Sequence, residues 1–142
     1  MAEGIIDLTI VTPERAVVHE KVDEVQIPGA SGYFGVLPGH APLFSELKVG
    51  EVSYRQGDRT FSLAVAWGFV EVQSDQVRVL AETAERAQEI DLERATRAKA
   101  RAEQRIAKGG EDIDYNRALI ALERALIRIQ VATRSHRDRI IA

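Results

Sequence analysis

Residues 80–91, LAETAERAQEID, mark the point at which the chain changes its chemical character. All four prolines and eight of the ten glycines precede this point, together with only four of the fifteen arginines. From Ala81 onward the chain has thirteen alanines, eleven arginines and no proline, and its only glycines are the pair Gly109-Gly110. Glycine and proline favour turns between short strands, whereas alanine and arginine are strong helix formers. The sequence therefore predicts two folding units, with domains at residues 1–84 and 85–142.

The first domain shows the two-residue alternation of half-buried strands. Apolar Ile6, Leu8 and Ile10 alternate with polar Asp7 and Thr9, and this period recurs further along. The recurring segments are residues 24–27, 61–65, 70–72 and 77–79. Turn sequences such as Gln56-Gly57-Asp58 separate them. Short strands at this spacing predict an antiparallel β-sandwich or barrel.

One segment of the first domain departs from this pattern. Residues 31–43, SGYFGVLPGHAPL, contain more glycine and proline than a plain strand and more apolar residues than an ordinary loop. We predict a structured surface loop here, with Tyr33, Phe34 and Leu37 as candidates for exposure. The pattern fits a rigid turn with buried aromatic residues as well as a docking edge for a partner.

The second domain is expected to be an antiparallel hairpin of two helices. Asp91 is a good N-cap for a helix that continues to about Lys108, where Gly109-Gly110 would end it. Asp112 or Asp114 would then cap a second helix that reaches about Arg137. A connection this short places the two helices side by side and antiparallel.

The second helix carries two apolar strips, whereas a surface helix needs only one. The first is a heptad-like seam flanked by Ala118 and Ala125, and consists of Tyr115, Leu119, Leu122, Leu126 and Ile129. The second consists of Ile120, Ile127 and Val131. Two strips predict two packing partners: the β domain, another chain, or each in turn.

Charge is distributed unevenly between the domains. Residues 1–80 have 6 basic and 11 acidic side chains, and residues 81–142 have 13 and 11. Arginines form stripes on both helices, at positions 94, 97, 101 and 105 and at positions 117, 124 and 128. Clustered guanidinium groups suit phosphate oxygens, so binding of a polyphosphate is one interpretation. The other is that these arginines stay solvated and partly paired, as Glu93 with Arg97.

No pattern of catalytic or metal-binding residues is found in the sequence. The chain has no cysteine, its histidines at positions 19, 40 and 136 are scattered, and no nucleophile elbow is present. The first domain is acidic and lacks aromatic residues interleaved with Lys or Arg, which disfavours nucleic-acid binding. No stretch has the ~20 apolar residues that span a bilayer, and no signal peptide is seen. We therefore expect a non-enzymatic protein that associates with membranes only through partners.

Several ordered blocks of the sequence resemble the epsilon subunit of the bacterial F-type ATP synthase. The most specific is Gly35-Val-Leu-Pro-Gly-His-Ala-Pro-Leu43. The others are residues 10–14, 27–29, 68–72, 79–81, 90–95 and 112–118. The resemblance covers essentially the full length. It implies an N-terminal β-sandwich and a C-terminal helical hairpin, in agreement with the two predicted domains.

The resemblance implies a non-catalytic subunit of the central stalk in a proton-translocating rotor. Its β domain would dock on the gamma subunit and the ring of c subunits, at the cytoplasmic face of the bacterial membrane. Tyr33, Phe34 and His40 become the candidate docking residues. Tyr33 departs from members that have an acidic residue at this position, and Trp67 stands where many relatives carry glycine.

The resemblance also implies that the hairpin regulates the complex. Extended along gamma, it would reach the alpha and beta subunits and block ATP hydrolysis; folded, it would release this block. Some members bind ATP in the folded hairpin through an Ile/Leu-Asp-x-x-Arg-Ala motif. The matching residues here are Ile90, Asp91, Arg94 and Ala95, with supporting Glu85, Arg101, Arg124 and Arg128. ATP, with or without Mg, would be a regulatory ligand rather than a catalytic cofactor. A free-standing nucleotide sensor is the alternative.

Overall fold

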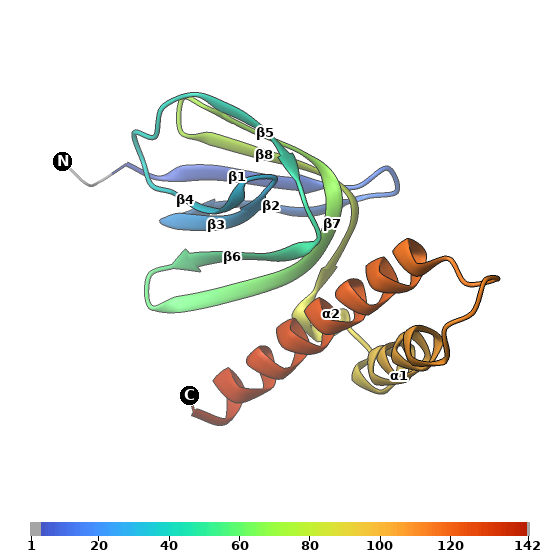
Figure 1. Cartoon of the computed structure of the whole chain (residues 1–142). Coiled ribbons are helices and arrows are strands. Elements are labelled where there is room, and N and C mark those ends of the chain that lie inside the picture. Colours follow the sequence, from blue (N-terminus) through green and yellow to red (C-terminus); the bar gives the residue numbers. More distant parts are fainter. Residues whose placement is uncertain (1–3, 142) are drawn as a thin grey trace. The chain divides into compact units, whose positions relative to one another are not determined.

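The computed structural model describes residues 4–141, with side chains as far as Arg134. The chain divides into two compact units, Met1–Arg86 and Ala87–Ala142. The first unit consists of strands and the second of helices (Figure 1). The last strand continues two residues beyond the expected end of the β domain, which places the boundary after Arg86.

Eight strands form the first unit. They are β1 (Ile6–Val11), β2 (Ala16–Val22), β3 (Glu24–Gly29), β4 (Gly32–Val36), β5 (Leu43–Leu47), β6 (Gly50–Gln56), β7 (Arg59–Gln73) and β8 (Gln76–Arg86). Their order is β2-β1-β8-β7-β5-β3-β4, and β6 pairs with β3 and β7. The predicted β-sandwich is confirmed, with one addition: β1 and β8 pair in parallel. Such a pair needs a long connection, which the six intervening strands provide.

Alternate side chains of these strands build the core. Ile6, Leu8 and Ile10 of β1 are fully buried, as are Val77 and Val79 of the neighbouring β8. The residues between them face outward, as the two-residue period predicts. Complete burial of each such side chain stabilises the fold by about 1.5–3 kcal/mol before chain entropy is counted.

The long strand β7 is strongly curved (Figure 1), and Trp67 and Gly68 in its interior both have a positive φ. It pairs with β6 over Arg59–Val65 and with β5 over Gly68–Val72. Gly68 has a φ of 128°, and a Cβ atom there would overlap the carbonyl oxygen of Leu80 on β8. Trp67 has a φ of 51°, a conformation that costs a non-glycine residue about 1–2 kcal/mol. Because of this bend, β7 pairs with both β6 and β5 along the same edge.

Arg86, the last residue of β8, ties the end of this strand to other strands of the first unit by hydrogen bonds. Its guanidinium donates hydrogen bonds to the carbonyl oxygen of Val17 at 2.9 Å and to the hydroxyl of Tyr54 at 3.3 Å. Burial raises the pKa of Tyr54, and the nearby Arg86 guanidinium opposes this rise. The first unit is therefore complete only when the chain includes Arg86.

The predicted loop at residues 31–43 is partly wrong. Gly32–Val36 forms β4, which pairs with β3, and Leu43 begins β5, so only residues 37–42 connect strands. The strand forms despite its glycines because it pairs with β3 residue by residue, Gly35 with Gln26 and Val36 with Val25. The tertiary pairing overrides the low strand preference of glycine.

The second unit has a short 3₁₀ turn, η1 (Ala87–Glu89), followed by α1 (Leu92–Lys108) and α2 (Tyr115–Ile141). The carboxylate of Asp91 caps α1 and that of Asp114 caps α2, as predicted. Gly109 ends α1 with a φ of 61°. Helix α2 continues four residues past its expected end, and the side chain of His136 lies outside the described residues. Among the described residues, no helix is long and apolar enough to cross a membrane.

Alanines, rather than leucines, form the contact between α1 and α2. Ala95, Ala102, Ala118 and Ala125 are buried where the helices pack together, and we call them the alanine seam. The heptad-like strip of α2 is not the main contact with α1, because its Tyr115, Leu119 and Leu126 are about half exposed. Alanine allows the two helix backbones to approach more closely than leucine does.

Candidate functional site

Seven of the eight predicted nucleotide-binding residues belong to the second unit. Glu85 is the exception, since it lies in β8 of the first unit. Ile90 is half-buried just before α1, while Arg94, Arg101 and Arg124 are exposed. Arg128 is half-buried on α2.

Two residues of the predicted motif have structural roles that need no ligand. The carboxylate of Asp91 accepts a hydrogen bond from the backbone N–H of Arg94 at 3.1 Å and so caps α1. Ala95 is fully buried in the alanine seam, and its N–H donates to the carbonyl oxygen of Asp91 at 3.0 Å. Only some residues of the motif therefore have side chains that are available to contact a ligand.

The hairpin brings arginines of both helices to one face. Arg94, Arg101 and Arg124 each precede a seam alanine by one residue, which turns them to the same flank of the seam at 100° per residue. Because the helices are antiparallel, equivalent flanks of the two helices form a single face. We call this the cationic face; it consists of Arg94, Arg101, Arg105, Arg117, Arg124 and Arg128. Guanidinium groups gathered in this way suit phosphate oxygens.

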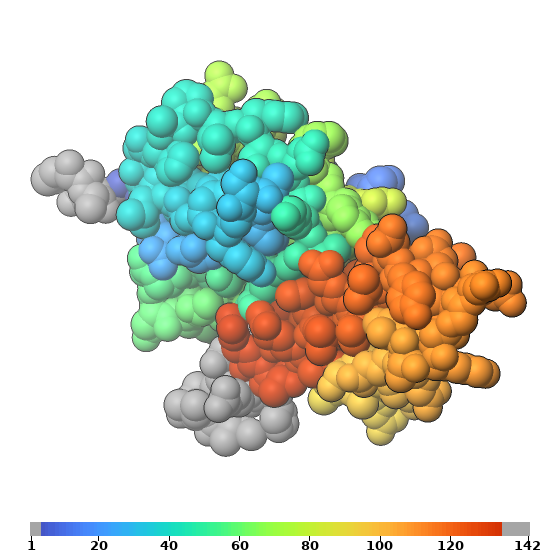
Figure 2. Space-filling view, in the orientation of Figure 1, coloured from blue at the N-terminus to red at the C-terminus, as the bar shows by residue number. Residues whose placement is uncertain are grey.

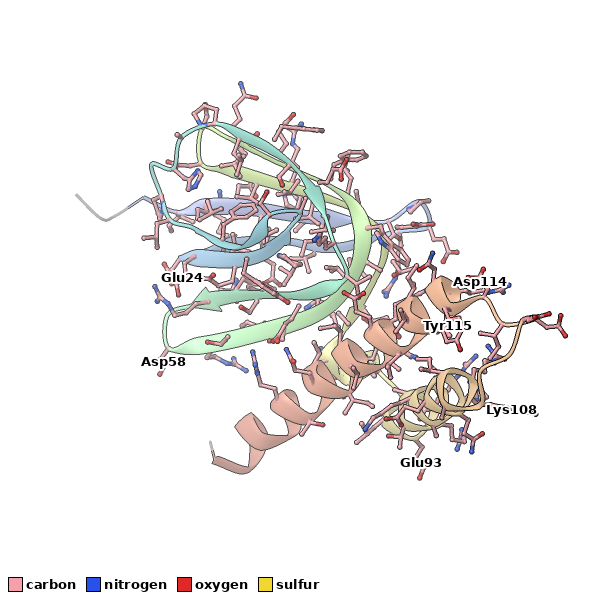
Figure 3. The ribbon with its side chains drawn as sticks, in the orientation of Figure 1. Glu24, Asp58, Glu93, Lys108, Asp114 and Tyr115 are labelled. Atoms are coloured by element: carbon pink, nitrogen blue, oxygen red, sulfur yellow. The ribbon has the colours of Figure 1, made fainter. Side chains whose placement is uncertain are left out.

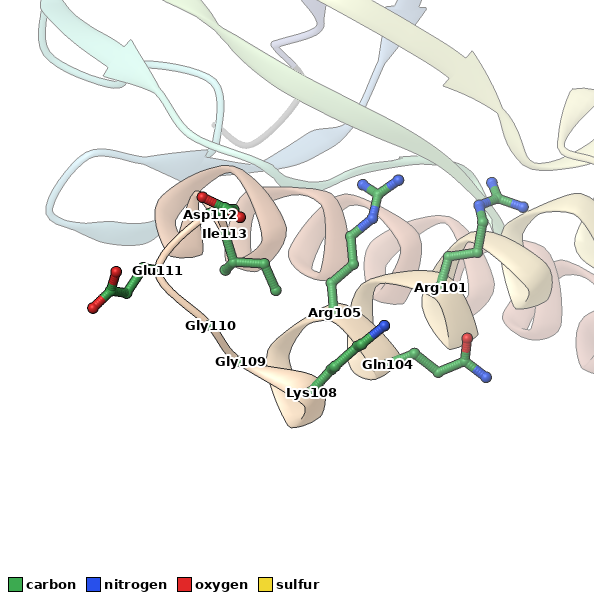
Figure 4. Close-up of a pocket in the computed structure, with 9 residues that line it drawn as sticks. All are labelled: Arg101, Gln104, Arg105, Lys108, Gly109, Gly110, Glu111, Asp112 and Ile113. Atoms are coloured by element: carbon green, nitrogen blue, oxygen red, sulfur yellow. The ribbon is translucent and has the colours of Figure 1, made fainter.

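A pocket of about 500 Å³ lies where α1 passes into α2. Figure 3 shows Lys108 at the last turn of α1, and Asp114 and Tyr115 at the first turn of α2. The pocket is lined by Arg101, Gln104, Arg105, Lys108, Gly109, Gly110, Glu111, Asp112 and Ile113. Arg101 and Arg105 extend the same way from α1, whereas Glu111 points away from them (Figure 4). In the part of the chain that the structure describes, no three acidic, His or Cys side chains gather to hold a metal.

The predicted docking residues do not form one patch. Tyr33 is exposed, and its hydroxyl accepts a hydrogen bond from the backbone N–H of Glu51 at 2.9 Å. Phe34 is half-buried against the core. Because successive strand residues point to opposite faces, Tyr33 and Phe34 cannot meet a partner on the same face of β4.

His40 belongs to the connection between β4 and β5, and a residue 36 positions away in the sequence from Gly39 holds this connection. The N–H of His40 donates to the carbonyl oxygen of Leu37 at 3.1 Å, which closes a tight turn at Gly39. The N–H of Gly39 donates to the carboxylate of Asp75 at 2.7 Å. Asp75 lies in the turn between β7 and β8, and its φ is 60°. This contact fixes the tip of the loop that carries His40.

We predict that Asp75→Gly frees this loop tip without straining the turn, since glycine adopts a φ of 60° easily. A hydrogen bond to a charged acceptor contributes about 1.5–3 kcal/mol, so amide hydrogen exchange at Gly39 should accelerate about tenfold or more. Ser74→Gly is the matched control, because Ser74 has a φ of 52° in the same turn. Equal exchange rates at Gly39 in the two variants would contradict the prediction.

Sequence reasoning missed an exposed apolar surface on the first unit. The rings of Phe44 on β5 and Phe69 on β7 stack at 5.5 Å, and Leu80 on β8 pairs with Phe69 in the ladder. All three are roughly half exposed or more. We call them the apolar patch. The signal was available, because Phe69 and Leu80 occupy the outward positions of strands whose valines point inward. Residues of β4 and β5, light blue to turquoise in Figure 2, reach the surface of the first unit.

The fold and these surfaces define a protein that acts by binding other molecules through two units. Two protein-family models match the chain. The model for the ATP synthase delta/epsilon chain β-sandwich domain matches residues 5–87, and the model for the long α-helix domain of the same chain matches residues 88–133. The chain therefore belongs to the ATP synthase delta/epsilon family, and the predicted membership in the epsilon type is confirmed. Its role as a non-catalytic subunit follows from this family.

Individual relatives agree with this assignment. The chain is 53% identical to the ATP synthase epsilon chain of Geobacter metallireducens over 139 residues, covering 96% of this chain and 99% of the relative. It is 53% identical to that of Desulforamulus reducens over 125 residues, covering 88% and 95%. A chain in the mitochondrial ATP synthase OSCP/F1/c-ring structure of Euglena gracilis is 25% identical, with a TM-score of 0.74 over 84% of this chain and 76% of that one.

Proposed function

We propose that the chain is the central-stalk subunit that connects gamma to the c-ring and restrains ATP hydrolysis through its hairpin, with ATP favouring the folded hairpin. The observation that carries the proposal is the hairpin itself, a separate unit with different side chains on its two faces. The complex would be proton-translocating, and the chain would lie at the cytoplasmic face of the bacterial membrane through its partners.

The first unit supports the docking role. The apolar patch exposes Phe44, Phe69 and Leu80 side by side, and exposed apolar patches of this kind mark interaction sites. The loop with His40 offers a second, polar contact whose geometry Asp75 fixes. We assign the patch to gamma, and Tyr33 of β4 together with the loop that carries His40 to the c-ring. Phe34 is half-buried against the core of the first unit, so it would support β4 rather than touch the partner.

The second unit supports a regulatory role. One flank of the alanine seam is cationic, and the other exposes Tyr115, Leu119 and Leu126 on α2. A hairpin whose helix contact is built largely on alanines buries little surface, so partners can compete for its faces. In the extended state the apolar flank would pack on gamma, and the arginines would face acidic segments of the alpha and beta subunits.

ATP would act by binding only one hairpin state. Arg94, Arg101, Arg124 and Arg128 share the cationic face, where triphosphate oxygens would neutralise them. Ile90 would contact the base, and Mg would accompany the phosphates. A ligand that binds the folded hairpin better than the extended one shifts the population toward it and so relieves inhibition.

Hydrolysis by the reconstituted complex tests the inhibitory role. A chain ending at Arg86 keeps all of β8, including the hydrogen bonds of Arg86, and should raise the ATP hydrolysis rate. A chain ending at Leu80 is a poor test, because it removes buried Ala81 and Ala84 and the Arg86 contacts. Unchanged hydrolysis with a fully bound chain ending at Arg86 would exclude the brake.

Small-angle scattering during an ATP titration tests the switch. ATP should compact the chain, and Arg94→Gln or Arg124→Gln should abolish the compaction. Arg97→Gln is the control, because Arg97 pairs with Glu93 at 4.0 Å and lies away from the cationic face. Compaction that persists in Arg94→Gln would exclude this site. Co-purification separates the stalk subunit from a free-standing sensor, since only the former brings down gamma and c.

A further inference from the structure

The two helices of the hairpin are copies of one sequence pattern. Residues 90–106 and 113–129 are identical at nine of seventeen positions when one is shifted by 23 residues. The identical pairs are Ile90/Ile113, Asp91/Asp114, Arg94/Arg117, Ala95/Ala118, Ala98/Ala121, Arg101/Arg124, Ala102/Ala125, Arg105/Arg128 and Ile106/Ile129. The motif Ile-Asp-x-x-Arg-Ala therefore occurs twice, at residues 90–95 and again at residues 113–118.

The structure builds the two copies in the same way. Asp114 accepts a hydrogen bond from the N–H of Arg117 at 3.1 Å, as Asp91 does from Arg94. The N–H of Ala118 donates to the carbonyl oxygen of Asp114 at 3.0 Å, and Ala118 is buried in the seam. Shared caps and shared seam positions relate α1 and α2 by an approximate two-fold axis. This axis is perpendicular to the plane that contains the two helices. Rotation about it exchanges α1 and α2 but keeps their arginines on the same face of the hairpin.

This symmetry sorts the arginines into two groups. The register that buries all four seam alanines sets Ala95 opposite Ala125 and Ala102 opposite Ala118. Arg117 then lies opposite position 103, midway between Arg101 and Arg105, which are about 6 Å apart along α1. The group of Arg101, Arg105 and Arg117 is the two-fold counterpart of the group of Arg124, Arg128 and Arg94.

We infer that Arg101, Arg105 and Arg117 form a second phosphate-binding site, which takes the phosphate groups of a nucleoside triphosphate or an inorganic polyphosphate. The pocket at the hairpin connection is lined by two of these arginines, Arg101 and Arg105, and by Ile113; Arg117 of α2 lies outside this lining, about one helical turn after Ile113. None of the three arginines forms an ion pair with a residue whose side chain the structure describes. Three guanidinium groups on one face repel each other, and a bound anion would relieve this repulsion.

Neighbouring charges modify the site without cancelling it. Lys108 adds a positive charge to the pocket, and Glu111 and Asp112 add two negative ones. The carboxylate of Glu111 points away from the arginines (Figure 4). Glu103 follows Ala102 by one residue and so lies on the other flank of the seam. The site therefore keeps a positive balance where the guanidinium groups gather.

The site rests in part on the proposed nucleotide function, because both use the same motif and both include Arg101, but its pocket does not involve Arg94. The test is a titration of the ¹⁵N-labelled full chain with ATP and, separately, with inorganic tripolyphosphate. Saturable shifts should appear at the amides of Gly109, Gly110 and Ile113 with both ligands. Equal affinities would assign recognition to phosphate alone, and tighter ATP would add a contact to the base; both results support the site.

Variants decide between a built site and diffuse attraction. Arg105→Gln combined with Arg117→Gln should weaken binding at the connection about tenfold or more, since each removes a charge-assisted contact. Arg97→Gln should change it by less than about twofold, because exposed charges contribute little singly. Circular dichroism would establish that the variants keep their helices. Equal weakening by Arg97→Gln, or no shift at residues 109–113, would overturn the second site.

Arg94→Gln separates the two proposals. It should remove ATP-induced shifts at the start of α1 while leaving those at Gly109 and Gly110. If Arg94→Gln removes both sets of shifts, the hairpin has one site and the second is overturned. If ATP shifts only the amides at the connection, the second site stands and the nucleotide site around Arg94 falls.

Discussion

Gly68→Ala is expected to destabilise the first unit by about 4 kcal/mol or more, at the upper end of single substitutions. The alanine Cβ would overlap the backbone carbonyl oxygen of Leu80, and backbone atoms of β8 cannot move away as a flexible side chain could. The φ of 128° adds strain for any residue with a Cβ atom. Chemical denaturation of the chain ending at Arg86 measures the loss, or shows that this variant does not fold.

Gly57→Ala is the matched control for Gly68→Ala. Gly57 also has a positive φ, of 64°, but a Cβ atom there would meet nothing within 4 Å. Its replacement should destabilise the unit by only about 1–2 kcal/mol, the ordinary strain of the left-handed conformation. Similar losses in the two variants would show that β7 can relax at the bend, and that the close approach to Leu80 is not what requires glycine.

Ala102→Leu is expected to separate the two helices of the second unit. Ala102 is buried in the alanine seam, where extra methyl groups would force the backbones apart at about 1–3 kcal/mol. A separated α1 of 17 residues is only marginally stable in water, so helicity should fall with the packing. Circular dichroism and scattering of the full chain measure both effects. Binding of ATP should weaken in parallel, because the cationic face needs both helices.

Ala100→Leu is the control for Ala102→Leu. Ala100 lies on the same helix and is exposed, and its direction from the axis is nearly opposite to the seam. Leucine there should leave helicity, compaction and ATP binding unchanged within error. Loss of compaction in both variants would mean that leucine disturbs α1 in general and that the seam does not hold the hairpin.

The strand and helix pattern could be predicted because it depends on local physics. Alternation at Ile6, Leu8 and Ile10 requires only that one side of β1 is buried, and Asp91 needs only its own helix to act as a cap. The strand at Gly32–Val36 could not be recognised in this way. Glycine lowers the local preference for a strand, and only the pairing of these residues with β3 shows that they are extended.

The candidate site also has features that the sequence shows and features that only the structure shows. The motif at Ile90, Asp91, Arg94 and Ala95 and the capping role of Asp91 were visible in the sequence, but the burial of Ala95 between the helices was not assigned. The choice between the alanines and the heptad leucines as helix contact also needed the structure. The alanines and the heptad leucines of α2 are both apolar, so hydrophobicity does not distinguish them. The close approach of the two helix backbones is what selects the alanines for the contact with α1.

The sequence by itself determined two units of different chemistry, the two ends of α1 and the membership of the family, because each depends on residues close together in the chain. The tertiary structure decided where the first unit ends, through the contacts of Arg86 with Val17 and Tyr54. It also decided which flank of the hairpin is cationic and which is apolar. The physical reason is that the alanine seam fixes the rotation of each helix, and that rotation directs every other side chain.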